Sequence, residues 1–281
     1  MGIPSPDQNR QDNQGTSQMN EKSSNFPQPL IDELLCIADT KWVLGHWYIK
    51  VMQNGRGLTD FNALSAMAQD QLGHTRALFS LLEQHGCFAT NWLEFERSRE
   101  QIHSMQLLDD PPESWFDFVI TALLAELALQ AAFDLGGEQR GGLGFLSRKC
   151  KEECDFHLLY LNGILQGLSA AGIEQAREQA RASLAVRYPL ALQWFRDGGS
   201  GADMRNTFIR DCEQQIARRL DMPLPASRDG ADWDAARRRP QGAIMPATLW
   251  EFILPTNEQA VMCRRPLQVS NDDSIRFVAS V

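Results

Sequence analysis

The chain has 281 residues, of which 43% are hydrophobic and 22% charged, and its formal net charge at pH 7 is −9. These values are typical of a globular protein with a buried core, and the acidic balance argues against a nucleic-acid partner. No run approaches 18 consecutive apolar residues, the N-terminus is polar and the six cysteines are scattered. The sequence therefore predicts a cytoplasmic protein without a membrane span or a signal peptide.

The first half of the chain predicts a tail followed by three helices. Residues 1–26 are rich in Gln, Asn, Ser and Pro, which predicts a disordered tail. Apolar residues at helical spacing predict one helix from Pro29 to about residue 54 and a second from an N-cap at Thr59 to Gly86. The stretch 113–137 is apolar nearly all round, as the central helix of a bundle is.

The second half predicts three more helices, over about 144–169, 174–197 and 202–220. We therefore expect an all-α bundle over 27–222 and an irregular C-terminal extension over 223–281. Within the extension, "ATLWEFIL" predicts a short helix and "SIRFVASV" carries the only strand signal. The run "RRRPQ" at 237–241 could contact a CoA phosphate, but its pattern favours a solvated charge run.

Two acid–histidine pairs are the main candidates for chemistry. Asp70 precedes His74 by four residues on the second predicted helix, and Glu153 precedes His157 in the same way on the fourth. Residues four apart lie on one face of a helix, so each pair could ligate a metal. A di-iron site in a four-helix bundle instead uses Glu-x-x-His on two helices and a single Glu on each of the other two.

The positions three before the histidines hold Gln71 and Cys154 rather than Glu. The first helix adds Asp39 and His46, seven residues apart on one stripe, and the third adds Glu126 within an apolar run. These side chains could complete an unusual metal site. Buried acids and histidines also hydrogen-bond across a bundle, to one another or to Lys41, and this second interpretation is favoured.

Four helical stretches of the chain carry a family resemblance. They read "LLCIADTKWVLGHWYIKVM", "ALSAMAQDQLGHTRALFSLLEQHG", "FDFVITALLAELALQAAF" and "RKCKEECDFHLLYLNGILQGL". These stretches resemble the ferritin-like subunits of the bacterial phenylacetyl-CoA epoxidase family, and are most similar to its structural, non-catalytic C-type component. The resemblance covers roughly residues 30–200 and implies a ferritin-like four-helix bundle core with additional C-terminal helices.

The catalytic subunit of that family carries Glu-x-x-His twice, a Glu on the first helix and an acid on the third. When this pattern is aligned with the present sequence, the two Glu positions of the Glu-x-x-His motifs fall on Gln71 and Cys154. The Glu of the first helix falls on or near Trp42, and the acid of the third helix falls near Leu129, unless Glu126 replaces it. The resemblance thus implies a subunit with no catalytic residue, no metal and no other cofactor. Its partner would be a catalytic subunit that holds the di-iron centre and acts on an aromatic acyl-CoA, with the acyl-CoA at their shared interface.

Three functions stay open on the sequence. The chain is a scaffold subunit, a ferritin-like binding protein without a partner enzyme, or a di-iron or mono-metal oxygenase in its own right. Helices 30–54 and 113–135 are apolar around more of their circumference than one core needs, which predicts a hetero-oligomer. The residues of the alternative metal site would be drawn from Asp39, His46, Asp70, His74, Glu126, Glu153 and His157.

Overall fold

The computed structural model describes residues 26–133, 141–168, 174–196, 201–227 and 232–253. The predicted C-terminal strand at 274–281 and all but the last residue of the predicted disordered tail lie outside these ranges. That residue, Phe26, stacks on His85 with 3.8 Å between ring centroids.

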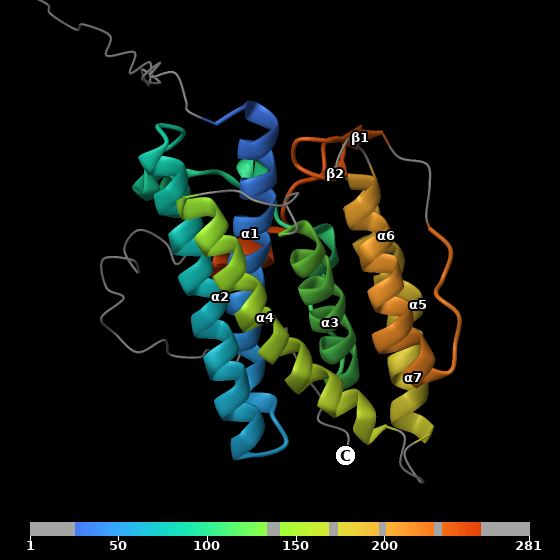
Figure 1. Cartoon of the computed structure of the whole chain (residues 1–281). Coiled ribbons are helices and arrows are strands. Elements are labelled where there is room, and N and C mark those ends of the chain that lie inside the picture. The colour runs from blue at the N-terminus through green and yellow to red at the C-terminus, as the bar shows by residue number, and fades with distance from the viewer. Residues whose placement is uncertain (1–25, 134–140, 169–173, 197–200, 228–231, 254–281) are drawn as a thin grey trace, which may run out of the picture.

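Four long helices form the core of the fold (Figure 1). Helix α1 packs along α2, and α4 packs on both α2 and α3. This arrangement confirms the predicted all-α, ferritin-like bundle. The four helices are α1 (Gln28–Val51), α2 (Leu58–Gln84), α3 (Trp115–Ala132) and α4 (Gly142–Gly167).

Helix α3 lies in the middle of the molecule, between the other core helices and the pair α5 (Glu174–Gln193) and α6 (Gly201–Cys212) (Figure 1). All of its residues except Phe116 and Gln130 are buried. Among the described residues it is the one helix whose length and composition would allow a membrane span. However, 83% of it is buried inside the protein, as expected for a core helix.

The apolar circumference of α1 and α3 is therefore covered within the chain itself. Sixteen residues of α1 are buried along its length, against α2, α3 and α8 (Ala247–Ile253). The apolar faces of these two helices therefore do not by themselves call for a partner, because the predicted helices of the second half, α5, α6 and α8, cover them.

Helices α1 and α2 approach closely at Gly45. A Cβ atom at this position would lie 3.0 Å from Leu72 and 3.2 Å from Gln71, which is tighter than ordinary van der Waals contact. The predicted N-cap at Thr59 is wrong, because α2 begins at Leu58 after Gly57. The Asp60 carboxylate instead accepts a 2.8 Å hydrogen bond from the backbone N–H of Arg56, just before the helix.

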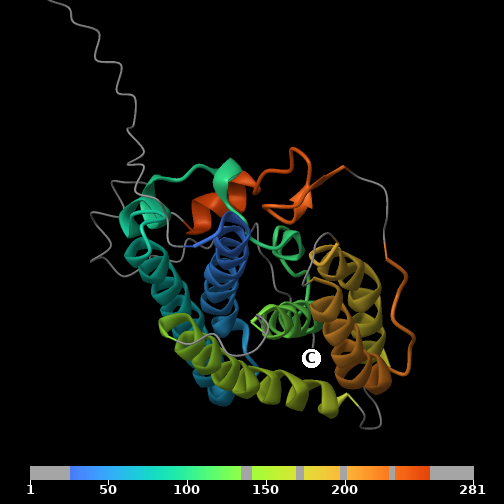
Figure 2. The same ribbon diagram turned by 45° about the horizontal axis from the view of Figure 1, so that its top comes forward.

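After α6 the chain continues through a π-helical turn, Glu213–Ala217, into α7 (Arg218–Leu220). Together, α6, this turn and α7 span the predicted sixth helix. In the C-terminal extension, β1 (Trp233–Asp234) pairs antiparallel with β2 (Arg239–Pro240). Figure 2 shows this hairpin and α8 on the same side of the molecule, next to α1. The short helix predicted at 247–254 is α8.

The arginine run at 237–239 is not a solvated charge run. Arg239 is fully buried and binds the Asp109 carboxylate through two hydrogen bonds of 2.9 and 2.8 Å. Arg238 pairs with Glu33, and its guanidinium lies 4.7 Å from the ring centroid of Trp194. The hairpin directs Arg238 and Arg239 toward carboxylates that are far away in the sequence. The local sequence pattern therefore could not predict that these arginines are buried.

Candidate functional site

Polar side chains from all four core helices meet in the middle of the bundle. We call this cluster the polar centre. Several of its members are fully buried in an otherwise apolar core. It comprises Lys41 and Tyr48 of α1, Asp70, Gln71 and His74 of α2, Glu126 of α3, and Glu153, Cys154 and His157 of α4.

Glu126 is the hub of the polar centre. Its Oε1 atom accepts hydrogen bonds from Tyr48 Oη at 2.6 Å, Gln71 Nε2 at 2.7 Å and His157 Nδ1 at 2.9 Å. Its Oε2 atom lies 3.3 Å from the Cys154 thiol, which donates to it. Burial, and next the negative charge of Glu126, raise the pKa of Tyr48 well above its ordinary value, so the hydroxyl stays a donor. The carboxylate is satisfied entirely by donors of this chain.

His157 lies between two carboxylates. Its Nδ1 atom faces Glu126, and its Nε2 atom lies 3.2 Å from Oδ2 of Asp70. Both ring nitrogens therefore donate, which only the protonated imidazolium can do. Burial opposes this charge, but the charge of Glu126 and the hydrogen bonds to Asp70 and Glu126 outweigh burial and raise the pKa of His157 to about 9. His157 is a cation at neutral pH.

His74 has the opposite protonation state. Its Nε2 atom hydrogen-bonds to Glu153, while its Nδ1 atom lies 3.4 Å from the ammonium of Lys41. A lysine ammonium can only donate, so Nδ1 is unprotonated and accepts. Burial, followed by the charge of Lys41, lowers the pKa of His74 to about 4. His74 is thus neutral at pH 7, and its one free lone pair points toward Lys41.

The acids and histidines pair crosswise rather than within their own helices. Asp70 of α2 bonds to His157 of α4, and Glu153 of α4 bonds to His74 of α2. This agrees with the interpretation favoured on the sequence, in which the buried acids and histidines hydrogen-bond to one another across the bundle. Each acid faces the neighbouring helix, and the side chains of Asp70 and Glu153 stay 38% and 26% exposed at the edge of the bundle.

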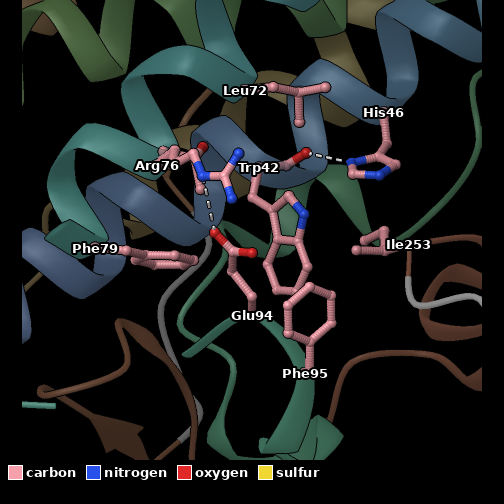
Figure 3. A pocket seen from close by; sticks show the side chains of 9 residues that line it. Trp42, His46, Leu72, Arg76, Phe79, Glu94, Phe95 and Ile253 are labelled. Atoms are coloured by element: carbon pink, nitrogen blue, oxygen red, sulfur yellow. Dashed lines mark hydrogen bonds and ion pairs between the residues drawn. The ribbon is translucent and has the colours of Figure 1, made fainter. Parts of the chain in front are cut away.

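The two remaining candidates of α1 lie outside the polar centre. Asp39 is fully buried and binds the Arg97 guanidinium through two hydrogen bonds of 2.8 and 2.6 Å, which help to hold the pKa of Asp39 well below its usual range despite burial. His46 donates from Nδ1 to the backbone carbonyl of Trp42 at 2.8 Å. Figure 3 shows it beside Trp42 and Ile253, at a separate cavity of about 260 Å³.

Lys41 and Tyr48 were not among the predicted site residues, although Lys41 was expected as a partner for the acids. The sequence does contain part of the information that points to these two residues. The two residues are seven apart on a helix that is otherwise apolar on this face, so they share one stripe. A lysine on a buried stripe needs a polar partner, and here it has Gln71 Oε1 at 2.9 Å.

The polar centre does not fit a di-iron site. Such a site needs about four carboxylates and two histidines whose free lone pairs converge on the metal. Both nitrogens of His157 donate, the free lone pair of His74 faces an ammonium, and Glu126 is fully engaged. Among the described residues, no group of three or more His, Cys, Asp or Glu side chains is placed to hold a metal ion.

A surface hollow of about 450 Å³ lies between α2 and α4, next to the polar centre. We call it the α2–α4 hollow. Its apolar lining comes from Ala77, Leu81, Phe145 and Leu146, and its polar lining comprises Gln69, Asp70, His74, Gln84, Lys149 and Glu153. The polar centre therefore reaches solvent on this side of the bundle, through the two half-exposed acids.

Comparison with protein-family models matches residues 11–224 to a family described as phenylacetic acid catabolic protein. The match covers more than half of the chain and includes every residue of the polar centre. None of the curated proteins with which the chain was compared matches it. By its sequence and by its helical fold, the chain belongs to the family of phenylacetic acid catabolic proteins.

Proposed function

We propose that this chain is the structural, non-catalytic subunit of a multicomponent di-iron oxygenase that epoxidises the ring of phenylacetyl-CoA or a related aromatic acyl-CoA. Membership of the phenylacetic acid catabolic protein family supports the substrate class. In this proposal a cytoplasmic catalytic subunit with two intact Glu-x-x-His motifs holds the iron. The present chain is its scaffold and helps to shape the acyl-CoA pocket at the interface.

One observation supports the non-catalytic role most strongly: the positive charge in the polar centre comes from the protein itself. The ammonium of Lys41 lies 2.9 Å from Gln71 Oε1 and 3.4 Å from His74 Nδ1, and the imidazolium of His157 pairs with Glu126. The imidazolium thus pairs directly with the buried acid Glu126, and the charge of Lys41 acts on it from further away, where an iron-binding bundle would use metal charge. An uncompensated carboxylate in this core would be strongly destabilising.

The residues of the polar centre therefore have a structural role in this proposal. Tyr48, Gln71 and His157 hold one oxygen of Glu126, which ties α1, α2 and α4 to α3. Hydrogen bonds to charged groups contribute about 1.5–3 kcal/mol each, more than neutral ones. The network fixes the relative positions of the four helices, and with them the surface offered to the catalytic subunit.

The proposal is tested by separating assembly from turnover. The chain is purified alone and as a complex with the catalytic subunit, and oxygenation of phenylacetyl-CoA is measured with a supplied reductant. We expect no product from the chain alone. We expect Glu126→Gln to lower the yield of complex while leaving kcat per assembled complex unchanged.

The control variant is Glu213→Gln, which changes an exposed carboxylate in the π-helical turn after α6 and should alter neither quantity. Product formed by the isolated chain would contradict the proposal. So would a fully assembled complex whose kcat is abolished by Glu126→Gln, because the acid would then act in the chemistry.

A further inference from the structure

The outward face of α4 carries large apolar side chains that no described element covers. Phe145, Phe156 and Leu159 are 68%, 71% and 71% exposed. Figures 1 and 2 show α4 as an outer helix of the bundle. With about 100° of rotation per residue, these three residues and the exposed Arg148 and Glu152 fall within one stripe about 100° wide. The packing of the opposite face of α4 against α2 and α3 does not require apolar residues in this stripe.

The charges on this stripe are segregated along the helix. The exposed basic residues Arg148 and Lys149 lie in its first half, beside Phe145. The exposed acids Glu152 and Asp155 follow them and precede Phe156. Within the chain, Lys149 pairs with Glu153 at 3.0 Å and Asp155 accepts a 2.6 Å hydrogen bond from Gln130 of α3. A helix with this polarity is complementary to a copy of itself that runs in the opposite direction.

The α2–α4 hollow lies beside the first half of the stripe. Its apolar wall is formed by Ala77, Leu81, Phe145 and Leu146, and its volume of about 450 Å³ is large enough for a phenyl side chain. The exposed Phe156 lies three helical turns further along α4, where it cannot reach the hollow of its own chain. The stripe thus presents an apolar projection and a recess at separate positions.

We infer that the outward face of α4 binds a second copy of this chain, with the two α4 helices antiparallel around a two-fold axis near residue 150. This axis places Arg148 of each copy opposite Glu152 of the other. It also places Phe156 of each copy at the level of residue 144 of the other, over the α2–α4 hollow. In a two-fold interface each complementary contact is made twice, so charge and shape favour the same arrangement.

This interface would also close the exposed edge of the polar centre. Asp70 and Glu153 line the hollow that Phe156 of the second copy would fill. Removing water there would strengthen their hydrogen bonds to His157 and His74. The inference does not depend on the proposed scaffold function, since it concerns the chain alone.

The test uses analytical ultracentrifugation of the full-length chain and two charge reversals. We expect the unaltered chain to form a dimer, and Arg148→Glu or Glu152→Arg alone to weaken it at least tenfold, because each creates two like-charge contacts. An equimolar mixture of the two variants should dimerise again, since both contacts become attractive in the mixed pair. A pairing within one helix could not produce this recovery.

Phe156→Asp should also weaken the dimer at least tenfold. The matched control is Val186→Asp, which changes an apolar residue of α5 that is 52% exposed and should leave the dimer intact. A chain that is monomeric at all concentrations would overturn the inference. A dimer that is affected neither by the charge reversals nor by Phe156→Asp would also overturn it. The same holds if the outward face of α4 binds the catalytic subunit and not a second copy of this chain.

Discussion

The ammonium of Lys41 donates a 2.9 Å hydrogen bond to the side-chain carbonyl of Gln71, at a point where both side chains are buried. The resemblance drawn from the sequence implies that the position of Gln71 corresponds to a Glu of the catalytic subunit. Here an amide and an ammonium satisfy each other, and the ammonium also faces His74. This contact connects α1 to α2 and places the ammonium beside His74, where burial first and the charge of Lys41 next lower the pKa of the imidazole.

We expect Lys41→Met to raise the pKa of His74 from about 4. Burial is the largest cause of the low value, and the charge of Lys41 is the next. Removing the charge while burial persists should therefore move the pKa part of the way toward the ordinary value of about 6.5. NMR titration of the His74 ring measures this change. Lys50→Met, at the end of α1, is the control and should leave the titration unaltered.

The stability of the protein should be greatest near pH 6.5 and fall on both sides. The pKa of His157 is raised to about 9 in the folded protein, so its contribution is complete below about 6.5 and is lost as the pH rises to 9. The pKa of His74 is lowered to about 4, so its contribution is complete above about 6.5 and is lost as the pH falls to 4.

Each loss should amount to at most about 3 kcal/mol. Urea unfolding at a series of pH values measures both limbs. His157→Gln should flatten the alkaline limb alone, and His74→Gln the acid limb alone. A free energy of unfolding that does not change between pH 6.5 and 9 in the unaltered chain would show that His157 is not held as a buried cation.

Glu126→Gln should destabilise the fold by about 3–5 kcal/mol, because it removes the buried one of the two carboxylates that hold the imidazolium of His157. Chemical unfolding at pH 7 measures the change. Glu213→Gln provides the comparison on the protein surface and should stay within about 0.5 kcal/mol. Equal, small effects of the two substitutions would mean that Glu126 does not hold the network together.

Arg239→Met should release the C-terminal extension from the bundle. The guanidinium is fully buried, and its loss would leave Asp109 and the carbonyl of Ser104 without a donor, at a cost of about 3 kcal/mol or more. Limited proteolysis should then cut the chain within 232–253. Arg218→Met, at an exposed position, should leave the digestion pattern unchanged.

A designed gain of metal binding tests the reason why the polar centre does not suit iron. Gln71→Glu and Cys154→Glu together create two Glu-x-x-His motifs around His74 and His157. With Lys41→Ala added, we expect at least about one iron per chain, because the ammonium is then no longer present to pair with the two new acids. With Lys41 retained, its ammonium should pair with the new acids and keep the iron content much lower.

The sequence predicted the helices and several members of the polar centre, because these follow from local periodicity. Glu126 stands out as a single carboxylate in an apolar run, and the two histidines fall on the second and fourth helices as expected. The partner of Asp39 could not be predicted, since Arg97 lies 58 residues away in an irregular segment. The burial of Arg239 depends in the same way on Asp109, 130 residues distant.

The most direct test of the proposed scaffold role is the iron content of the chain, measured by elemental analysis after expression with iron and with the catalytic subunit, followed by separation of the two. We predict less than about 0.1 iron per present chain and about two per catalytic subunit, the number in a full di-iron centre. About two irons per present chain, lost on Asp70→Ala or Glu153→Ala, would contradict the account and favour an oxygenase with its own rearranged site.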